Sequence, residues 1–350
     1  MRILVTGHDG YIGTVMVGVL KRAGHEVTGL DTFFYEDCRF GDRPVSIPTI
    51  RKDLRDVGPG DVTGYDAVIH LAALSNDPLG TLDERCTLEI NHRGSVCLAR
   101  AAKAAGVPRF LFASSCSLYG AAGDDLLDET AAFNPITAYG RSKVLVEQDV
   151  SQLADDRFSP TFFRNATAYG VSPRLRADVV VNNLVGVAYL TGTVMIESDG
   201  TPWRPLVHVE DISEAFRAAL EAPREAVHNQ AFNIGSTVEN YQIRDLADMV
   251  RDTVPGCSVT YREGGGPDPR CYRVNCDKVT AALPGFRPQW TVERGIEQLY
   301  GAFQSNGLTA DAFASYFRLP QIQAHLRAGR LDHTLRWQVG ASRTAVGVEA

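Results

Sequence analysis

The sequence lacks any long apolar run and any cluster of basic residues. No stretch reaches the roughly 20 consecutive apolar residues that a membrane-spanning helix needs, so we expect no membrane partner. The formal net charge is -7, and the Lys and Arg residues are scattered. This argues against a nucleic-acid partner, because binding nucleic acid requires a basic surface. A ligand that carries phosphate must then be bound by a few local groups.

The cysteines form no recognisable pattern either. There are 7 of them, an odd number, scattered and with no Cys-x-x-Cys pair, so neither a disulfide framework nor a zinc site is indicated. The apolar start of the chain is soon broken by Gly7, which is unlike a signal peptide. We therefore expect no bound metal, and a protein with reduced thiols in the cytoplasm.

The sequence does contain short apolar runs that alternate with segments of helical period. The runs of strand length are residues 3–6, 26–30, 67–71, 110–113 and 161–164, and helix-like stretches such as 15–23 and 86–105 separate them. Strands so short and apolar are buried on both faces of a sheet. The alternation predicts an α/β fold with a Rossmann-type, doubly wound parallel sheet, whose ligands bind at the carboxyl ends of the strands.

Beyond about Ser172 the alternation weakens, because Pro and Gly residues interrupt shorter elements. We expect residues 1–171 to form mainly the Rossmann domain and residues 172–305 to form mainly a smaller α/β substrate lobe, with some chain returning to the Rossmann domain. Apolar residues at helical spacing predict a C-terminal helical extension over 306–337, and residues 338–350 are expected to be a flexible tail.

A glycine-rich loop follows the first predicted strand and begins the first helix, which is the position that a dinucleotide-binding loop requires. Its spacing is G-x-x-G-x-x-G. Gly7 would make the tight turn, Gly10 would let the backbone approach a diphosphate, and Gly13 would allow close packing of helix on strand. We expect these glycines, with Tyr11 and Ile12 between them, to bind the cofactor.

The ends of the next strands indicate which dinucleotide binds. Asp31 ends the second strand, where a carboxylate accepts hydrogen bonds from ribose hydroxyls and repels a 2′-phosphate, so we predict NAD rather than NADP. Asp53 and Leu54 follow the third strand and could contact the adenine. His70 is more typical of a structural strand histidine than of a catalyst. Small residues after the fourth strand leave room for the cofactor, namely Leu71, Ala72 and Ala73.

Three further residues predict the chemistry. Tyr139 and Lys143 are four residues apart and share a helical face, and Ser115 follows the fifth strand, where its hydroxyl can meet the tyrosine phenol. A free phenol has a pKa near 10, but a lysine ammonium and a positively charged nicotinamide would both favour the phenolate. Ser115, Tyr139 and Lys143 are thus predicted to be a catalytic set for hydride transfer, with the tyrosine as acid and base.

With these motifs in place, the chain resembles the extended short-chain dehydrogenase/reductases over roughly residues 1–305. It is most similar to their NAD-dependent nucleotide-sugar epimerase and dehydratase branch, typified by the UDP-galactose 4-epimerases. Further matching segments are NHRG at 91–94, RNATAYG at 164–170, NNL at 182–184, RPLVHVED at 204–211 and FNIG at 232–235. The resemblance implies a nucleotide-sugar substrate. It places Asn91 beside the cofactor, Asn183 and Arg204 on the substrate diphosphate, and Asp268 near its ribose.

The chain also departs from the family pattern. Thr167 stands where relatives often carry an asparagine, and the arginine usually found shortly before Asp268 is missing, with Arg270 just after it. The residues that recognise the nucleotide therefore differ from those of the relatives, and the identity of the base cannot be carried over from them. The substrate site is expected to include Ser75, Ser115, Ser117, Tyr139, Thr167, Asn183, Arg204, Asp268 and Arg270. The C-terminal extension lies outside the pattern and is expected to cover the lobe or join a neighbouring subunit.

The two positions after Ser115 separate the reactions of this family. The related dehydratases carry Asp-Glu there, and decarboxylase-like or 3,5-epimerase-like enzymes need Glu or Cys in the second position, whereas this chain has Cys116 and Ser117. A serine hydroxyl cannot act as that acid or base, and Cys116 is more typical of a buried, inert thiol than of a reactive one. The pattern therefore favours epimerisation at C4, by oxidation to a keto sugar and reduction on its other face.

Two alternatives stay open at this point. A one-way nucleotide-sugar ketoreductase or dehydrogenase would use the same three residues, although Asp31 disfavours the NADPH that biosynthetic reductases usually use. A non-catalytic NAD-binding regulator would normally have lost Tyr139 or Lys143. By the resemblance we expect a homodimer formed by two helices from each subunit, residues 86–105 and 139–153, although an apolar helix face could equally be buried within one chain.

Overall fold

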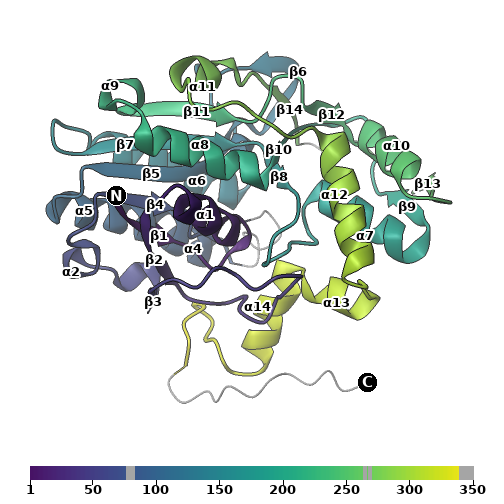
Figure 1. Cartoon of the computed structure of the whole chain (residues 1–350), viewed down its shortest axis with the longest axis horizontal. Helices are drawn as coiled ribbons and strands as arrows, with labels where there is room; N and C mark the ends of the chain where they lie inside the picture. The colour runs from purple at the N-terminus through teal and green to yellow at the C-terminus, as the bar shows by residue number, and fades with distance from the viewer. Residues whose placement is uncertain (76–82, 263–265, 267–269, 339–350) are drawn as a thin grey trace.

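A parallel sheet of seven strands forms the centre of the computed structural model, which describes residues 1–75, 83–262, 266 and 270–338 (Figure 1). The strand order is β11-β7-β5-β4-β1-β2-β3. The strands are β1 (Arg2–Thr6), β2 (Glu26–Asp31), β3 (Thr49–Arg51), β4 (Ala67–His70), β5 (Arg109–Ser115), β7 (Ser159–Asn165) and β11 (Gln230–Ile234). The order reverses between β1 and β4, so the loops after these strands diverge and leave a crevice at their carboxyl ends. The predicted Rossmann-type α/β fold is confirmed.

Helices cover both faces of this sheet because its strands are apolar on both sides. Ile3 and Val5 of β1 pack with α1 (Tyr11–Arg22) and α8 (Val209–Glu221), whereas Leu4 between them faces the opposite core, with α5 (Ser95–Ala104) and α6 (Ala138–Ser151). Short helices α2 (Pro59–Val62), α9 (Arg224–Val227) and α11 (Asp277–Ala282) complete the layers. The helix expected over residues 86–105 is wound in three parts, namely α4 (Glu84–Thr87), a π-helical stretch (Leu88–Gly94) and α5.

The smaller lobe packs three helices, α7 (Val180–Thr191), α10 (Ile243–Thr253) and α12 (Val292–Ser305), against short strands. The strands form three small sheets: β8 (Thr167–Tyr169), β10 (Trp203–His208) and β12 (Asn240–Gln242); β9 (Thr193–Ile196) and β13 (Ser258–Tyr261); β6 (Ala121–Leu127) and β14 (Cys271–Val274). Two of these strands, β6 and β8, precede residue 172 in the sequence. They belong to the lobe because they pair with β14 and β10 of the later chain. Strand β11 returns to the large sheet.

The C-terminal extension, residues 306–337, is helical over a shorter length than its spacing predicts. It forms α13 (Ala310–Ser315) and α14 (Arg318–Arg327), after which Gly329 adopts a left-handed backbone with φ of 63°. The chain then turns around Asp332, whose carboxylate accepts hydrogen bonds from the backbone N–H groups of Thr334 and Arg336 at 2.8 and 3.0 Å. This turn, rather than a helix, carries the last apolar residues, Leu331 and Leu335, into a buried cluster.

The extension crosses both parts of the molecule. Phe313 of α13 packs against the lobe at Phe303 of α12, whereas α14 and the turn lie against the chain that follows β2 (Figure 1). There, Trp337 donates a hydrogen bond from its indole to the carbonyl of Thr32 at 2.7 Å. Across the described ranges, no helix combines the length and the apolar character needed to span a membrane.

Candidate active site

A cavity of about 890 Å³ lies where the carboxyl ends of β1, β2, β4 and β5 face the smaller lobe. It brings together almost all the residues that the sequence predicts for the site. The predicted cofactor residues that line it are Gly7, Gly10, Tyr11, Ile12, Gly13, Asp31, Asp53, Leu54, Leu71, Ala72 and Ala73. The predicted catalytic and substrate residues that line it are Ser75, Ser115, Ser117, Tyr139, Lys143, Thr167, Asn183, Arg204 and Arg270. Asp268 lies outside the described residues.

The glycine-rich loop is packed too closely for side chains. Gly7 has φ of 74°, and a Cβ there would come within 2.7 Å of the backbone nitrogen of Ala72. A Cβ on Gly13 would come within 2.2 Å of the Gly7 carbonyl oxygen. Gly10 is the N-cap of α1 and brings no side chain to the first N–H groups of that helix. The start of α1 thus lines the cavity with its N–H groups uncapped, which fits a dinucleotide diphosphate.

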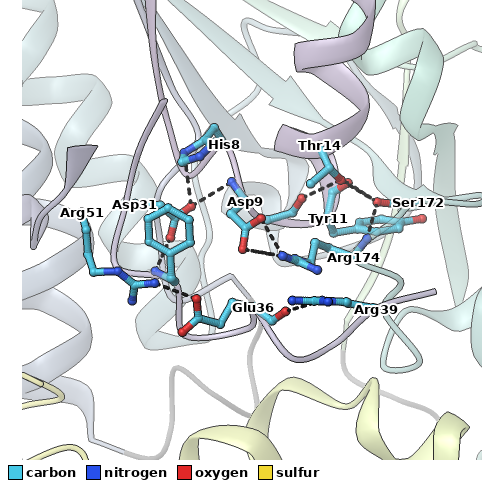
Figure 2. A network of polar contacts seen from close by, with 12 residues as sticks. His8, Asp9, Tyr11, Thr14, Asp31, Glu36, Arg39, Arg51, Ser172 and Arg174 are labelled. Atoms are coloured by element: carbon cyan, nitrogen blue, oxygen red, sulfur yellow. Dashed lines mark hydrogen bonds and ion pairs between the residues drawn. The ribbon is translucent and has the colours of Figure 1, made fainter. Parts of the chain in front are cut away.

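Asp31 is fixed at the end of β2 by two backbone donors (Figure 2). Its carboxylate accepts hydrogen bonds from the N–H of Asp9 at 3.0 Å and from the N–H of Phe33 at 2.8 Å. Phe33 itself has a left-handed backbone with φ of 58°. Asp31 therefore lines the cavity in a defined orientation beside the glycine-rich loop, as a ribose ligand requires.

A buried ion pair that the sequence did not suggest ties this loop to the lobe (Figure 2). Arg174 donates to both carboxylate oxygens of Asp9 over 2.8 to 3.1 Å. Next to this pair, the Ser172 hydroxyl donates to the carbonyl of Tyr11 at 2.8 Å and lies 3.0 Å from the Thr14 hydroxyl. Both ion-pair partners lie in loops 165 positions apart, so no local periodicity marks them.

The Asp53 carboxylate, predicted to contact the adenine, already accepts several hydrogen bonds within the protein. It caps a short 3₁₀ helix (Leu54–Asp56) and accepts three hydrogen bonds from Arg55 at 2.6 to 2.9 Å. Burial acts to raise the pKa of Asp53, but the hydrogen bonds and charge of Arg55 hold it below its usual range. Two of these bonds end on Oδ1 and one on Oδ2, so Oδ2 keeps a lone pair for a ligand amino group.

The three predicted catalytic residues come from two elements that end at the cavity. Ser115 is the last residue of β5, and its Oγ accepts a hydrogen bond from the Ser117 N–H at 3.1 Å. Tyr139 and Lys143 lie on α6, which begins after the N-cap Thr137. The Lys143 Nζ lies 5.5 Å from the centre of the Tyr139 ring and donates to the Ala113 carbonyl at 2.6 Å. Burial lowers the pKa of Lys143 to about 7.

Asn91 supports the cavity from behind instead of lining it. The side chain is 1% exposed and exchanges two hydrogen bonds with the backbone of Leu74, at 2.8 and 3.0 Å. It also donates to the Ser142 hydroxyl of α6 at 3.3 Å. The amide is therefore used in holding the loop after β4 against the catalytic helix, which differs from the direct cofactor contact that the resemblance implied.

His70 is structural, as the sequence suggested. Its two ring nitrogens lie 2.7 Å from the hydroxyls of Thr6 and Ser95. Burial lowers the pKa of His70 to about 3, so the ring stays neutral at physiological pH.

The two residues after Ser115 have opposite environments. Cys116 is fully buried, and its thiol donates to the Arg164 carbonyl at 3.0 Å. Burial raises the pKa of Cys116 well above its usual range, which is typical of an unreactive thiol. Ser117 lines the cavity, and its buried Oγ has no hydrogen-bond partner among the residues that the structure describes. Only the serine is placed to meet a substrate.

The lobe contributes the predicted phosphate ligands. Arg204, on β10, is held by a hydrogen bond from Nη1 to the carbonyl of Trp203 at 2.8 Å and by a second to the carbonyl of Arg270. Asn183, on α7, donates from its amide to the carbonyl of Ala177 at 2.9 Å. Both side chains are thus anchored from one side while lining the cavity.

Several cavity residues were missed by the sequence analysis. Asn165 ends strand β7 of the large sheet, and its buried Oδ1 has no partner among the described residues. Its place at a strand end could have identified it. Arg176 and Asp178 form a buried ion pair at 2.9 Å in the loop before α7. Arg318 reaches the cavity from the C-terminal extension. No sequence signal marks Arg176, Asp178 or Arg318, because their place at the cavity depends on how distant segments of the chain meet.

Comparison with known proteins identifies the family of the chain. Residues 3–235 match the model of the NAD dependent epimerase/dehydratase family. The UDP-glucose 4-epimerases of Corynebacterium glutamicum and Mycolicibacterium smegmatis are 28% and 30% identical, over 87% of this chain and 96% and 99% of theirs. The solved structure of MoeE5 in complex with UDP-glucuronic acid and NAD is 27% identical, with a TM-score of 0.75 over 87% of this chain and 99% of that one. The chain therefore belongs to the NAD-dependent epimerase/dehydratase family, and its cofactor is NAD.

Proposed function

We propose that this protein is an NAD-dependent epimerase that inverts C4 of a nucleotide-activated sugar through a keto-sugar intermediate. The observation that carries the proposal is the single cavity lined by Ser115, Tyr139 and Lys143, in which the residue next to the serine, Cys116, is buried away from the reacting groups. The relatives named UDP-glucose 4-epimerase support the same reaction.

Each catalytic residue has a defined task in this proposal. The Tyr139 phenolate takes the proton from the C4 hydroxyl, and the Ser115 hydroxyl donates a hydrogen bond to the same oxygen. NAD, which the glycine-rich loop and Asp31 would hold, would supply the hydride acceptor for C4 and the hydride donor for the other face of the keto sugar. Lys143 is held by the Ala113 carbonyl close to the Tyr139 ring. When the Lys143 amine is protonated, its positive charge stabilises the phenolate of Tyr139.

The surroundings of Ser115 favour epimerisation over loss of water. A dehydratase must expel the 6-hydroxyl, which requires a second acid or base beside the serine. Here the adjacent groups are a buried thiol, Cys116, whose pKa is raised by burial, and the hydroxyl of Ser117. Neither exchanges protons at neutral pH. The remaining chemistry, hydride and proton transfer at one carbon, leaves the cofactor unchanged after each turnover.

The substrate diphosphate is assigned to the lobe. Arg204 offers a guanidinium that is 9% exposed and lines the cavity, with Asn183 and Arg270 lining the same region. A guanidinium and amide groups are suited to the oxygens of a diphosphate. We place the sugar between these residues and Tyr139.

The test is to incubate the protein in D₂O with UDP-glucose, dTDP-glucose and UDP-glucuronic acid, and to follow products by NMR and NADH by absorbance. We expect one of these to give its C4 epimer without deuterium in the sugar and without accumulated NADH. Deuterium at C5 or loss of the 6-hydroxyl would indicate another reaction of the family. Stoichiometric NADH would indicate the one-way dehydrogenase, and NAD binding without turnover on a broad panel of nucleotide sugars would indicate a regulator.

A further inference from the structure

We propose that Arg318, supplied by the C-terminal extension, binds the diphosphate of NAD from the side opposite the glycine-rich loop. The family model ends at residue 235, so this arginine lies outside the matched residues. The inference concerns the cofactor and does not depend on which sugar is the substrate.

Arg318 is a buried cation with unused hydrogen-bonding capacity. It is 1% exposed, donates from Nη2 to the Arg174 carbonyl at 2.7 Å, and places its guanidinium 4.3 Å from the centre of the Tyr35 ring. Its Nη1 is buried and has no hydrogen-bond partner among the described residues. Because Arg318 also lines the cavity, the cavity is where a partner for this nitrogen can bind.

The charged residues described around Arg318 are paired with one another. Arg174 is paired with Asp9 at 2.8 Å, and Arg176 is paired with Asp178 at 2.9 Å. Within the described residues, no carboxylate lies within ion-pair distance of Arg318. The two ion pairs and Arg318 together comprise three guanidinium groups and two carboxylates. A buried charge without a partner is costly, so an anionic ligand would be stabilised here.

The position of Arg318 selects the cofactor diphosphate over the substrate diphosphate. Tyr35, beneath the guanidinium, follows β2 and Asp31, and Arg174, which accepts its hydrogen bond, holds the glycine-rich loop through Asp9. The substrate diphosphate is assigned instead to Arg204 on β10. The charge of Arg318 also acts on Tyr11 at the start of α1, where it opposes the rise in pKa that burial causes.

Two helix starts reinforce this anion site. Helix α1 begins at Tyr11 behind Gly10, and α14 begins at Arg318 itself behind Phe317. Neither N-cap residue provides a side-chain hydrogen bond to its helix, and the first residues of both helices line the cavity. The N-terminal end of a helix favours negative charge. A diphosphate between α1 and α14 would thus meet both helix starts as well as the guanidinium.

Contacts farther along the extension hold α14 in place. The His325 ring lies 3.0 Å from the carbonyl of Phe34, and Trp337 donates to the carbonyl of Thr32 at 2.7 Å. Arg336 forms an ion pair with Asp56 at 2.6 Å. These contacts, all C-terminal to Arg318, fix the extension to the cofactor end of the Rossmann domain.

The test compares Arg318→Gln with Arg327→Gln, which removes an exposed arginine from the last turn of the same helix. Calorimetric titrations of the full-length, nucleotide-free protein would use NAD, ADP, adenosine and UDP. We expect Arg318→Gln to lower the affinity for NAD and for ADP about tenfold or more, since a charged hydrogen bond to a buried group is lost. Adenosine lacks the diphosphate, and UDP probes the substrate site, so both should bind within about twofold of wild type. The control should match wild type throughout.

Other outcomes would overturn the proposal. Unchanged ADP binding in folded Arg318→Gln would remove Arg318 from the cofactor site, and a loss confined to UDP would assign it to the substrate diphosphate. An equal loss of ADP and adenosine would mean that the extension only encloses the adenosine. If Arg318→Gln does not fold, Arg318→Lys carries the test. This variant keeps the charge but loses the planar guanidinium, so its affinity for ADP should fall a few-fold while its affinities for adenosine and UDP stay the same. Unchanged ADP binding would again contradict the proposal.

Discussion

The ammonium of Lys143 lies 2.6 Å from the carbonyl oxygen of Ala113, so the catalytic helix is joined to the end of the central strand β5 by the side chain that supports the catalytic tyrosine. The same burial that fixes this bond lowers the pKa of Lys143 to about 7, from an ordinary value of 10.5. The residue is thus placed for chemistry at the expense of stability.

The first prediction concerns the loss of folding stability caused by burying Lys143. Between pH 7 and pH 10.5 the unfolded chain binds a proton at Lys143 that the folded, nucleotide-free protein does not, so stability rises with pH across this window and the full penalty is present below pH 7. Lys143→Met, which cannot be charged, should therefore be more stable than wild type at pH 7 by a few kcal/mol, at about 1.4 kcal/mol per pKa unit. Thermal unfolding across this pH range measures the difference, which should shrink toward pH 10.5.

The control for this prediction is Lys21→Met, an exposed lysine on α1, whose stability difference from wild type should not change with pH. Lys143→Met should also lose most of its turnover, because it no longer supports the phenolate. A variant that is both less stable at pH 7 and fully active would contradict the prediction on both counts.

The second prediction is that Tyr139 exchanges the proton in the chemical step. Phenylalanine keeps the ring and removes only the hydroxyl, so Tyr139→Phe should fold and bind NAD and the nucleotide sugar but lose about 10²-fold or more in kcat. Single-turnover kinetics on the confirmed substrate locate the loss. Tyr65→Phe, at a tyrosine outside the cavity, should be unaffected. If Tyr139→Phe retains most of its turnover, the short-chain dehydrogenase mechanism does not apply.

The third prediction is that Asp31 excludes NADP. Its carboxylate, held by the N–H groups of Asp9 and Phe33, would face the 2′-phosphate, and two like charges about 4 Å apart repel by several kcal/mol at an intermediate dielectric. Titration of both cofactors should show a preference for NAD of about 10²-fold or more, and Asp31→Ser should narrow it. Asp42→Ser, at an exposed loop position, should not. Equal affinities in the wild type would refute the assignment.

The fourth prediction separates the two diphosphate sites. Arg204→Ala should weaken binding of the nucleotide sugar by on the order of 2–4 kcal/mol, because a desolvated, charged hydrogen bond is lost. NAD affinity should stay the same. Arg251→Ala, on the exposed face of α10, serves as the control. Unchanged substrate affinity in a folded Arg204→Ala would place the substrate diphosphate elsewhere.

The sequence revealed those parts of the site that depend on local structure. The glycine spacing at Gly7, Gly10 and Gly13 defines one turn, and the spacing of Tyr139 and Lys143 defines one helix face, so each motif could be recognised within a few residues. The short apolar runs located the strands of the sheet. The carboxyl ends of parallel strands meet at one edge of a sheet, and this general rule predicts Ser115 and Asp31 at one cavity.

The parts that depend on how distant loops meet could not be found in this way. The Asp9–Arg174 pair joins two loops, and the extension ends its helix at Arg327 because of a left-handed glycine and an aspartate-centred turn that apolar spacing does not show. Asn91 was expected beside the cofactor, but its amide is used by Leu74. The partners of Asp9 and Asn91 lie 165 and 17 positions away in sequence, whereas the turn at Asp332 is local but is not visible in the apolar spacing.

The hydrogen bond between Trp337 and Thr32 joins residues 305 positions apart, and this has a consequence for synthesis. A chain made from its N-terminus produces the glycine-rich loop and Asp31 first, yet the wall that covers the chain after β2 is the last described segment to leave the ribosome. Contacts so distant in sequence form late in folding. The nascent Rossmann domain therefore stays uncovered at its cofactor end until Trp337 has been synthesised.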